Sequence, residues 1–255
     1  MSAPISSYLL KYWLFPHRFH FEQELKNPEN SQRRVLSQIV SKLSDANYGQ
    51  IFKVKPSDTY KEYAEKIPVI QYAQLRHWID RQKIHQTSLL VDEPIIRYEF
   101  DRESNLIPYT KSLERSFFNY FATQAALAEP NQIDNSSQAY YRSKWSTKFA
   151  DFPISLLEPK QPYYVEAPIL IKAPQTEHCL PFLPEVFFEF IDDQKKIFRV
   201  HELAKNKIYG VIVSQKSGLY RYQLNTKVQV SKGYRNTPSF KVVHDTGSNF
   251  GQTVA

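Results

Sequence analysis

Apolar residues recur with a helical period in the first half of the chain. The clearest stripe has positions three or four residues apart: Val35, Leu36, Ile39, Val40 and Leu43. This spacing predicts an amphipathic helix from about 27 to 46. Asn27 suits the cap of that helix and Pro28 its first turn. Gly49, which follows it, can take positive φ and is expected to stop the helix.

Three shorter helices are expected after this one. Thr59 and Glu62 have the spacing of a capping box, which predicts a helix through Ala64. Apolar residues with helical spacing predict further helices over 72–81 and 113–127. The first half of the chain is therefore expected to be mainly helical.

The second half has the pattern of strands. Polar residues over 129–138 form the best linker candidate, and seven prolines punctuate the region that follows. A short strand is expected at 169–171, and Ser217–Gly218 has the composition of a hairpin turn. Beyond Pro184 the strand-like runs follow at short spacing: 186–191, 208–213, 219–224, 227–230 and 240–243.

Composition narrows the classes of function. Only 6 of the 255 residues are glycine, and neither GxGxxG nor GxxxxGK[ST] occurs, which excludes the common phosphate-binding loops. Lys and Arg outnumber Asp and Glu by 33 to 26, a net charge of +7. The basic residues are scattered, without a run of five or more, so a solvated basic surface is expected and not a nucleic-acid site.

The single cysteine, Cys179, excludes a disulfide framework within the chain. His17 and His20 have ligand-like spacing but no partner in a zinc pattern, so no metal site is expected. No apolar run approaches the ~20 residues of a membrane span. Lys11 and Pro16 interrupt the apolar start, which does not have the form of a secretory signal. A cytoplasmic protein without a membrane partner is expected.

Several short motifs occur in an order that a known family shares. They are Asn-Tyr-Gly-Gln at 47–50, Ile-Pro-Val-Ile-Gln-Tyr at 67–72, Pro-Ile-Ile-Arg-Tyr-Glu at 94–99, Leu-Ile-Pro-Tyr-Thr-Lys-Ser-Leu at 106–113, Glu-Ala-Pro-Ile at 166–169, Leu-Pro-Phe-Leu-Pro-Glu-Val-Phe-Phe-Glu-Phe at 180–190 and Ser-Gly-Leu-Tyr-Arg-Tyr at 217–222. In this succession the chain resembles the acyl-acid amido synthetases, auxin-responsive enzymes of plants and their bacterial relatives. Those enzymes adenylate a carboxylic acid and then transfer it to an amino acid.

The resemblance implies an α/β fold with an α+β-like character: a helical first half and a β-rich second half. It implies a single incomplete adenylating-type domain over 1–255, without the carboxy-terminal lid of the family. Its mainly helical part spans 1–128, and an internal block of the family is missing at the linker 129–138. The part over 139–255 combines Pro-rich loops with strands.

The resemblance also implies a nucleotide site and a ligand pocket. The remnants of the nucleotide site are Tyr109, Thr110, Lys111, Glu166, Arg221, Tyr222 and Thr226. The candidates for an acyl pocket are Phe188 and Glu189. Four of these residues have a simpler interpretation: Thr110 caps a helix, Glu166 is a solvated acid, Glu189 faces water or pairs with an arginine, and Arg221 forms a salt bridge between strands.

Departures from the family pattern concern the phosphates and the ribose. The family places a Ser/Thr/Gly-rich phosphate loop where this chain has residues 100–105, which lack glycine and include Asp101 and Glu103. These acids would repel a triphosphate, and the loss of preorganised donors is costly in rate. Val165 replaces a hydroxyl residue before Glu166, and Asn225–Thr226 replaces a Gly-Asp pair.

These departures predict a degenerate acyl-acid amido synthetase-like protein without catalytic residues or cofactor, which binds a ligand or a partner. A small carboxylic acid, self-association and a partner chain are the expected partners. Two alternatives stay open. The first is a functional ligase that uses ATP and Mg²⁺ to activate a carboxylic acid. The second is a basic, aromatic-rich module that binds nucleic acid.

Overall fold

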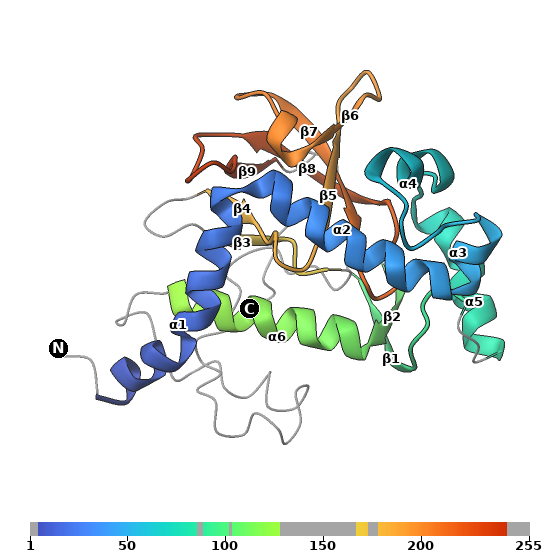
Figure 1. Cartoon of the computed structure of the whole chain (residues 1–255), viewed down its shortest axis with the longest axis horizontal. Helices are drawn as coiled ribbons and strands as arrows, with labels where there is room; N and C mark the ends of the chain where they lie inside the picture. The colour runs from blue at the N-terminus through green and yellow to red at the C-terminus, as the bar shows by residue number, and fades with distance from the viewer. Residues whose placement is uncertain (1–4, 86–88, 102–103, 128–166, 173–177, 244–255) are drawn as a thin grey trace, which may run out of the picture.

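The computed structural model describes residues 5–85, 89–101, 104–127, 167–172 and 178–243. Five helices come first, and a hairpin and a long helix follow them (Figure 1). They are α1 (Ile5–Lys26), α2 (Pro28–Asp45), α3 (Asn47–Ile51), α4 (Tyr60–Lys66), α5 (Tyr72–His85), β1 (Ile95–Phe100), β2 (Leu106–Thr110) and α6 (Lys111–Leu127).

The remaining described strands form one antiparallel sheet of seven strands in the order β3-β4-β9-β8-β7-β5-β6. A short 3-10 helix, η3 (Val200–Glu202), follows β6. The strands are β3 (Leu170–Lys172), β4 (Cys179–Pro181), β5 (Phe187–Ile191), β6 (Ile197–Arg199), β7 (Ile208–Ser214), β8 (Tyr222–Val230) and β9 (Phe240–Val243). The predicted fold class, a helical first half with a strand-rich second half, is confirmed.

Helix α2 matches its predicted position. The side chain of Asn27 accepts a hydrogen bond from the Asn30 backbone N–H, and Pro28 is the first helical residue. The expected role of Gly49 is wrong. It lies inside α3 without positive φ, and a Cβ there would stand 1.8 Å from the Leu43 carbonyl oxygen. Glycine is required at this position because two helices approach closely, not because the backbone turns.

The other predicted elements are confirmed in outline. The capping box of Thr59 and Glu62 is present, and α5 extends four residues beyond its predicted end, to His85. One correction concerns β8, a single strand that begins at Tyr222, where two strands over 219–224 and 227–230 were expected. Arg221, just before β8, has φ +49. This left-handed conformation interrupts the strand that was expected over 219–224. Helix α1 and the β1–β2 hairpin are not predicted, and the linker at 129–138 lies outside the described residues.

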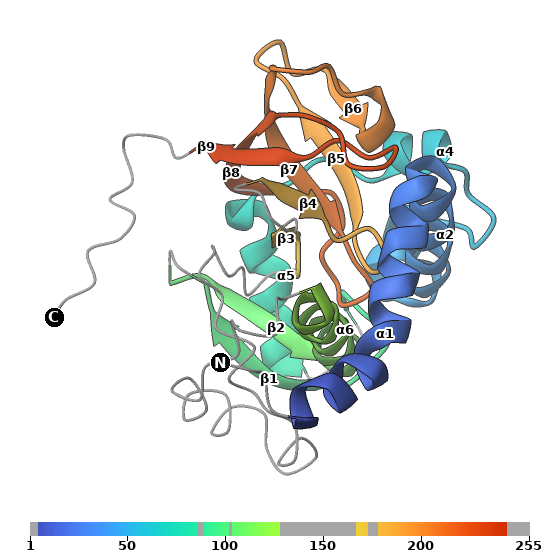
Figure 2. The same ribbon diagram turned by 90° about the vertical axis from the view of Figure 1, so that its left-hand side faces the viewer.

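One hydrophobic cluster contains side chains from both halves of the chain. Phe182, after β4, stacks on Phe21 of α1 with ring centroids 6.0 Å apart and meets the edge of Tyr120 of α6 at 5.5 Å. Gln32 of α2 ties this helix to the sheet, since its amide bonds to the Val186 carbonyl and the Phe188 N–H. In Figure 2, α1 and α2 run along one side of the sheet and α6 lies below it. No described helix is long and apolar enough to cross a membrane.

Candidate functional site

The residues that the family resemblance singles out fall into two places. Tyr109 and Thr110 end β2, and Lys111 begins α6. Phe188 and Glu189 lie on β5, two strands from β8, which holds Tyr222 and Thr226 and is directly preceded by Arg221. Glu166 lies outside the described residues.

The turn between β1 and β2 is the segment for which the resemblance implies a phosphate loop. The Asp101 N–H donates to the Asn105 carbonyl at 2.9 Å, and the Ser104 N–H donates to the Asp101 carbonyl at 3.2 Å. The Asp101 carboxylate accepts from both the backbone and the side-chain nitrogens of Asn105, at 2.7 and 2.8 Å. The amides of residues 101, 104 and 105 therefore donate within the turn, where they cannot converge on an anion.

The junction of β2 and α6 is organised as a helix cap. Thr110 is buried, and its Oγ1 accepts the Leu113 N–H at 3.2 Å, which confirms the capping interpretation. The Lys111 side chain is exposed. The Arg97 guanidinium lies 3.7 Å from the centre of the Tyr109 ring, and burial raises the pKa of Tyr109 above its ordinary value.

Arg221 and Glu189 form a buried ion pair. Arg221 Nε and Nη2 donate to the two oxygens of Glu189 at 2.9 and 2.8 Å, a bidentate arrangement. Nη1 donates to the carbonyls of Ala64 and Ile67 at 2.8 and 2.9 Å. Glu189 is fully buried and Arg221 is 5% exposed. Burial lowers the pKa of Arg221, but the hydrogen bond and the charge of Glu189, with contributions from Tyr63 and Tyr60, together raise it above its ordinary value, so the guanidinium stays charged.

Hydroxyl groups complete the surroundings of this pair. Tyr60 Oη donates to Glu189 Oε1 at 3.0 Å, and Ser214 Oγ accepts the Arg221 N–H at 2.9 Å. Tyr63 Oη lies 2.9 Å from the same Ser214 hydroxyl. Burial raises the pKa of both tyrosines, so they act as neutral hydrogen-bonding groups. The arginine pairing considered for Glu189 and the salt bridge considered for Arg221 are one interaction.

The other sequence-predicted residues of the sheet are also inside the protein. Phe188 belongs to the core and its ring stacks with that of Phe190, with centroids 6.2 Å apart. Tyr222 and Thr226 are buried, at 4% and 8% exposure. The backbone on either side of Tyr222 bonds to Ile70, which brings the segment before α5 to the start of β8. The structure therefore brings Glu189 and Arg221 together but separates them from the helix cap at Thr110.

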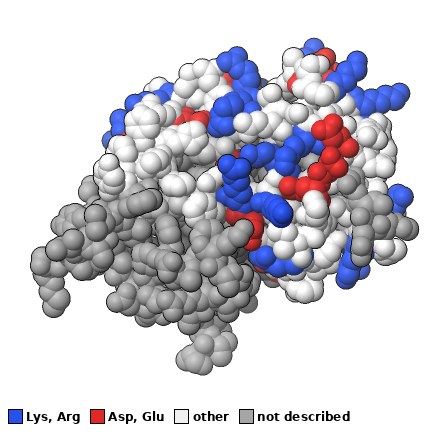
Figure 3. Space-filling model, turned by 60° about the horizontal axis from the view of Figure 1, so that its bottom comes forward, with Lys and Arg blue, Asp and Glu red and all other residues white. Residues whose placement is uncertain are grey.

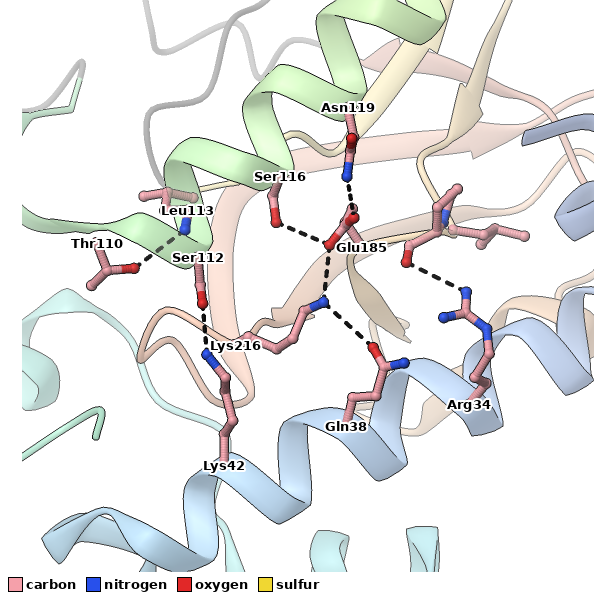
Figure 4. Close-up of polar contacts among 12 residues, drawn as sticks. Arg34, Gln38, Lys42, Thr110, Ser112, Leu113, Ser116, Asn119, Glu185 and Lys216 are labelled. Atoms are coloured by element: carbon pink, nitrogen blue, oxygen red, sulfur yellow. Dashed lines mark hydrogen bonds and ion pairs between the residues drawn. The ribbon is translucent and has the colours of Figure 1, made fainter. Parts of the chain in front are cut away.

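A second polar cluster, which we call the α2–α6 seam, was not predicted. It joins side chains of α2 and α6 with Glu185 before β5 and Lys216 of the β7–β8 loop (Figure 4). Glu93, in the segment before β1, adds contacts to Lys42 and Ser112. Its members are Gln38, Lys42, Glu93, Ser112, Ser116, Asn119, Glu185 and Lys216.

Two carboxylates organise the seam. Glu185 accepts from Ser116 Oγ at 3.1 Å, Asn119 Nδ2 at 2.7 Å and Lys216 Nζ at 3.1 Å. Glu93 accepts from the N–H and the hydroxyl of Ser112, and Lys42 Nζ lies 3.4 Å from it. The Lys42 side chain is 40% exposed and that of Lys216 is 22% exposed. Viewed from below, acidic and basic side chains of the described surface are intermixed around a hollow (Figure 3).

The described residues offer little redox or metal chemistry. They contain no group of three or more His, Cys, Asp or Glu side chains that could hold a metal ion. Cys179 is buried, as expected, and burial raises the pKa of its thiol to about 11. A thiol with this pKa is a weak nucleophile at neutral pH because almost none of it is thiolate.

Comparisons with known proteins bear on this geometry. The family model described as the GH3 family N-terminal domain matches residues 18–158, and that of the GH3 family central domain matches residues 179–244. A solved structure of AtGH3.15 acyl acid amido synthetase in complex with 2,4-DB is similar, with a TM-score of 0.66 and 14% identity. The match covers 88% of this chain and 69% of that chain.

A second structure, of GH3.15 acyl acid amido synthetase, has a TM-score of 0.64 and 14% identity, covering 87% of this chain and 69% of that one. At this identity the structural likeness shows the fold alone. No curated protein sequence matches. The N-terminal model alone covers more than half of the residues, and the resemblance inferred from the motifs points to the same enzymes. The chain belongs to the GH3 family.

Proposed function

We propose that this chain is a GH3-family protein that does not adenylate, and that it binds a small carboxylic acid without activating it. The β1–β2 turn carries this proposal. An adenylating enzyme must hold a triphosphate with preorganised donors, and loss of even one such donor costs about 10²–10³ in rate. Among the described residues of the turn, the Asn105 backbone amide donates to the Asp101 carboxylate, and the amides of Asp101 and Ser104 donate to carbonyls of the turn itself.

The state of Arg221 supports the same proposal. Four of its N–H···O contacts are directed to Glu189, Ala64 and Ile67. Moving the guanidinium to a phosphate would leave the buried Glu189 carboxylate without its counter-ion, which is strongly unfavourable. The residue that resembles a nucleotide-binding arginine therefore acts as a structural group.

The carboxylic-acid part of the proposal rests on similarity to a solved structure of the family. The solved neighbour is an acyl acid amido synthetase in complex with 2,4-DB, so the shared fold accommodates an acyl acid in that protein. Binding of an acid would stabilise the folded protein, and no adenylate would form. Its binding is expected to be independent of ATP.

Thermal unfolding with and without millimolar MgATP tests the proposal. A ligand at 100 times its Kd adds about 2.7 kcal/mol, which raises the Tm of a domain of this size by about 5–10 °C. We expect a cooperative melt with no such shift and no acid-dependent ATP–pyrophosphate exchange. A panel of acyl acids without nucleotide is expected to contain one that raises the Tm. An active GH3 enzyme in the same assays is the positive control.

The ligase alternative predicts the opposite result. It is favoured by the matches to both the N-terminal and the central GH3 domains. A rise in Tm with MgATP, together with pyrophosphate exchange that depends on an acyl acid, would establish it and overturn the proposal. Binding of an acyl acid with neither effect would support a binding protein.

A further inference from the structure

The N-terminal half of α1 presents an aromatic face to solvent. Tyr12, Phe15 and Phe19 are 81%, 59% and 52% exposed, and the rings of Phe15 and Phe19 stack with centroids 6.0 Å apart. Residues three and four apart lie on the same face of a helix. The three rings therefore form one stripe, which we call the aromatic face of α1.

The opposite face of α1 is fixed to the protein. Leu14, Phe21 and Leu25 are buried, and Phe21 stacks on Phe182. At the end of the helix, Thr237 Oγ1 donates to the Leu25 carbonyl at 2.8 Å. Both views of the ribbon show α1 at the outside of the molecule, beside α6 (Figures 1 and 2). The aromatic face is thus held outward by a helix that cannot turn it inward.

The surroundings of the aromatic face are basic. Arg18, His20 and Lys26 are exposed along the same helix. The Glu22 carboxylate forms ion pairs with Arg18 Nε at 3.0 Å and with Arg235 Nη2 at 2.9 Å.

The second carboxylate of α1, Glu24, lies 3.1 Å from Arg34 and 3.6 Å from His20. Glu22 and Glu24 therefore offset part of the positive charge here, but the four cations Arg18, Lys26, Arg34 and Arg235 outnumber these two carboxylates, so α1 and its neighbours stay net basic.

We propose that the aromatic face of α1 docks on an anionic lipid surface. Exposed aromatic rings beside Lys and Arg are the composition of helices that lie at the membrane interface. The net charge of +7 would attract the chain to acidic headgroups. This contact is peripheral, since no described helix is long and apolar enough to cross a bilayer. Pairing of two α1 helices is the less favourable use, because it brings like charges together.

Sedimentation with lipid vesicles tests the proposal on the full chain. We expect the protein to sediment with vesicles of phosphatidylcholine and phosphatidylserine, more weakly with phosphatidylcholine alone, and less as salt is raised. Changing Tyr12, Phe15 and Phe19 together to Ser is expected to lower the apparent partition coefficient by about tenfold or more. Phe100→Ser removes a phenyl group that is 67% exposed on β1 and is the matched control.

The outcomes separate the possibilities. Loss of binding in the triple variant but not in Phe100→Ser supports the proposal, and Phe19→Ser alone gives a partial loss if the triple variant melts early. Absence of sedimentation with acidic vesicles overturns it, as does equal loss in the Phe100→Ser control. A wild-type dimer that becomes a monomer in the triple variant, without vesicle binding, would also overturn it and assign the face to a second copy of the chain.

Discussion

Two ion pairs of the strand-rich half also form hydrogen bonds to the helical half of the chain, and the two pairs differ in accessibility. The Arg221–Glu189 pair is sealed, with side chains 6% and 0% exposed. The Lys216–Glu185 pair of the α2–α6 seam has side chains 22% and 13% exposed. In the first pair a planar guanidinium meets its acceptors in a fixed geometry, whereas in the second a flexible amine reaches a carboxylate that also accepts from Ser116 and Asn119.

This difference separates residues that come from the same stretches of sequence. Arg221 and Glu189 both come from stretches that resemble the family, and both side chains are buried. Glu185 belongs to the same stretch as Glu189, and Lys216 directly precedes the stretch that holds Arg221, yet the side chains of Glu185 and Lys216 are partly exposed. Membership of a family-like stretch therefore does not decide which charges the fold encloses.

The largest effect is expected from breaking the buried pair. Arg221→Met leaves the buried Glu189 carboxylate without a counter-ion, which should lower the free energy of unfolding by about 3–5 kcal/mol. Lys216→Met removes a partly exposed amine and should cost about 1 kcal/mol or less. Urea unfolding of the two variants measures both values. Equal losses would show that the two contacts do not differ as their burial indicates.

A smaller effect is expected from the same substitution at the two carboxylates. Glu185→Gln keeps an acceptor for Asn119 or Ser116 and loses the charge beside Lys216, at a cost of about 1 kcal/mol. Glu189→Gln places an NH₂ group against the donors of Arg221 and should destabilise the protein more than Glu185→Gln. The Tm values of the two variants at neutral pH measure this difference. A Glu185→Gln variant less stable than Glu189→Gln would reverse the comparison.

Elements with local signals were predictable from the sequence. The Asn27–Pro28 start of α2 and the Thr59–Glu62 capping box need only neighbours in the chain. Helix α1 lacks such signals because Pro16 interrupts its pattern, and a proline inside a helix is normally costly. It forms because Leu14 and Phe21 are buried against the rest of the protein. Tertiary packing there outweighs local propensity.

The charged contacts were less predictable because they join distant residues. Arg221 and Glu189 are 32 residues apart, so a salt bridge between strands was one of two interpretations that only the sheet could separate. Ser112 and Lys42 are 70 residues apart and lie on different helices, and no spacing rule connects them. Sequence motifs indicated the family but not which of its polar residues the fold encloses.

The smallest effect is expected at Asp58, which lies in the turn before α4. The carbonyl of Ala64 in α4 accepts a hydrogen bond from Arg221. The Asp58 carboxylate accepts from Lys66 Nζ at 2.6 Å and from the Lys55 N–H at 2.9 Å. Burial raises the pKa of Asp58, but these hydrogen bonds outweigh it, so the pKa lies below its ordinary value of 3.8. A carboxyl whose pKa is lower in the folded state stabilises the protein above its unfolded pKa.

This stabilisation should disappear as pH falls below about 4 and through the folded pKa, since the carboxylate then takes up a proton in both states. Asp58→Asn is expected to be less stable than wild type by about 1 kcal/mol at neutral pH. Urea unfolding of both proteins from about pH 7 to about pH 3 should show the difference narrowing only at the acid end, where protonation removes the charge. A difference that stays constant over this range would mean that the Asp58 charge does not stabilise α4.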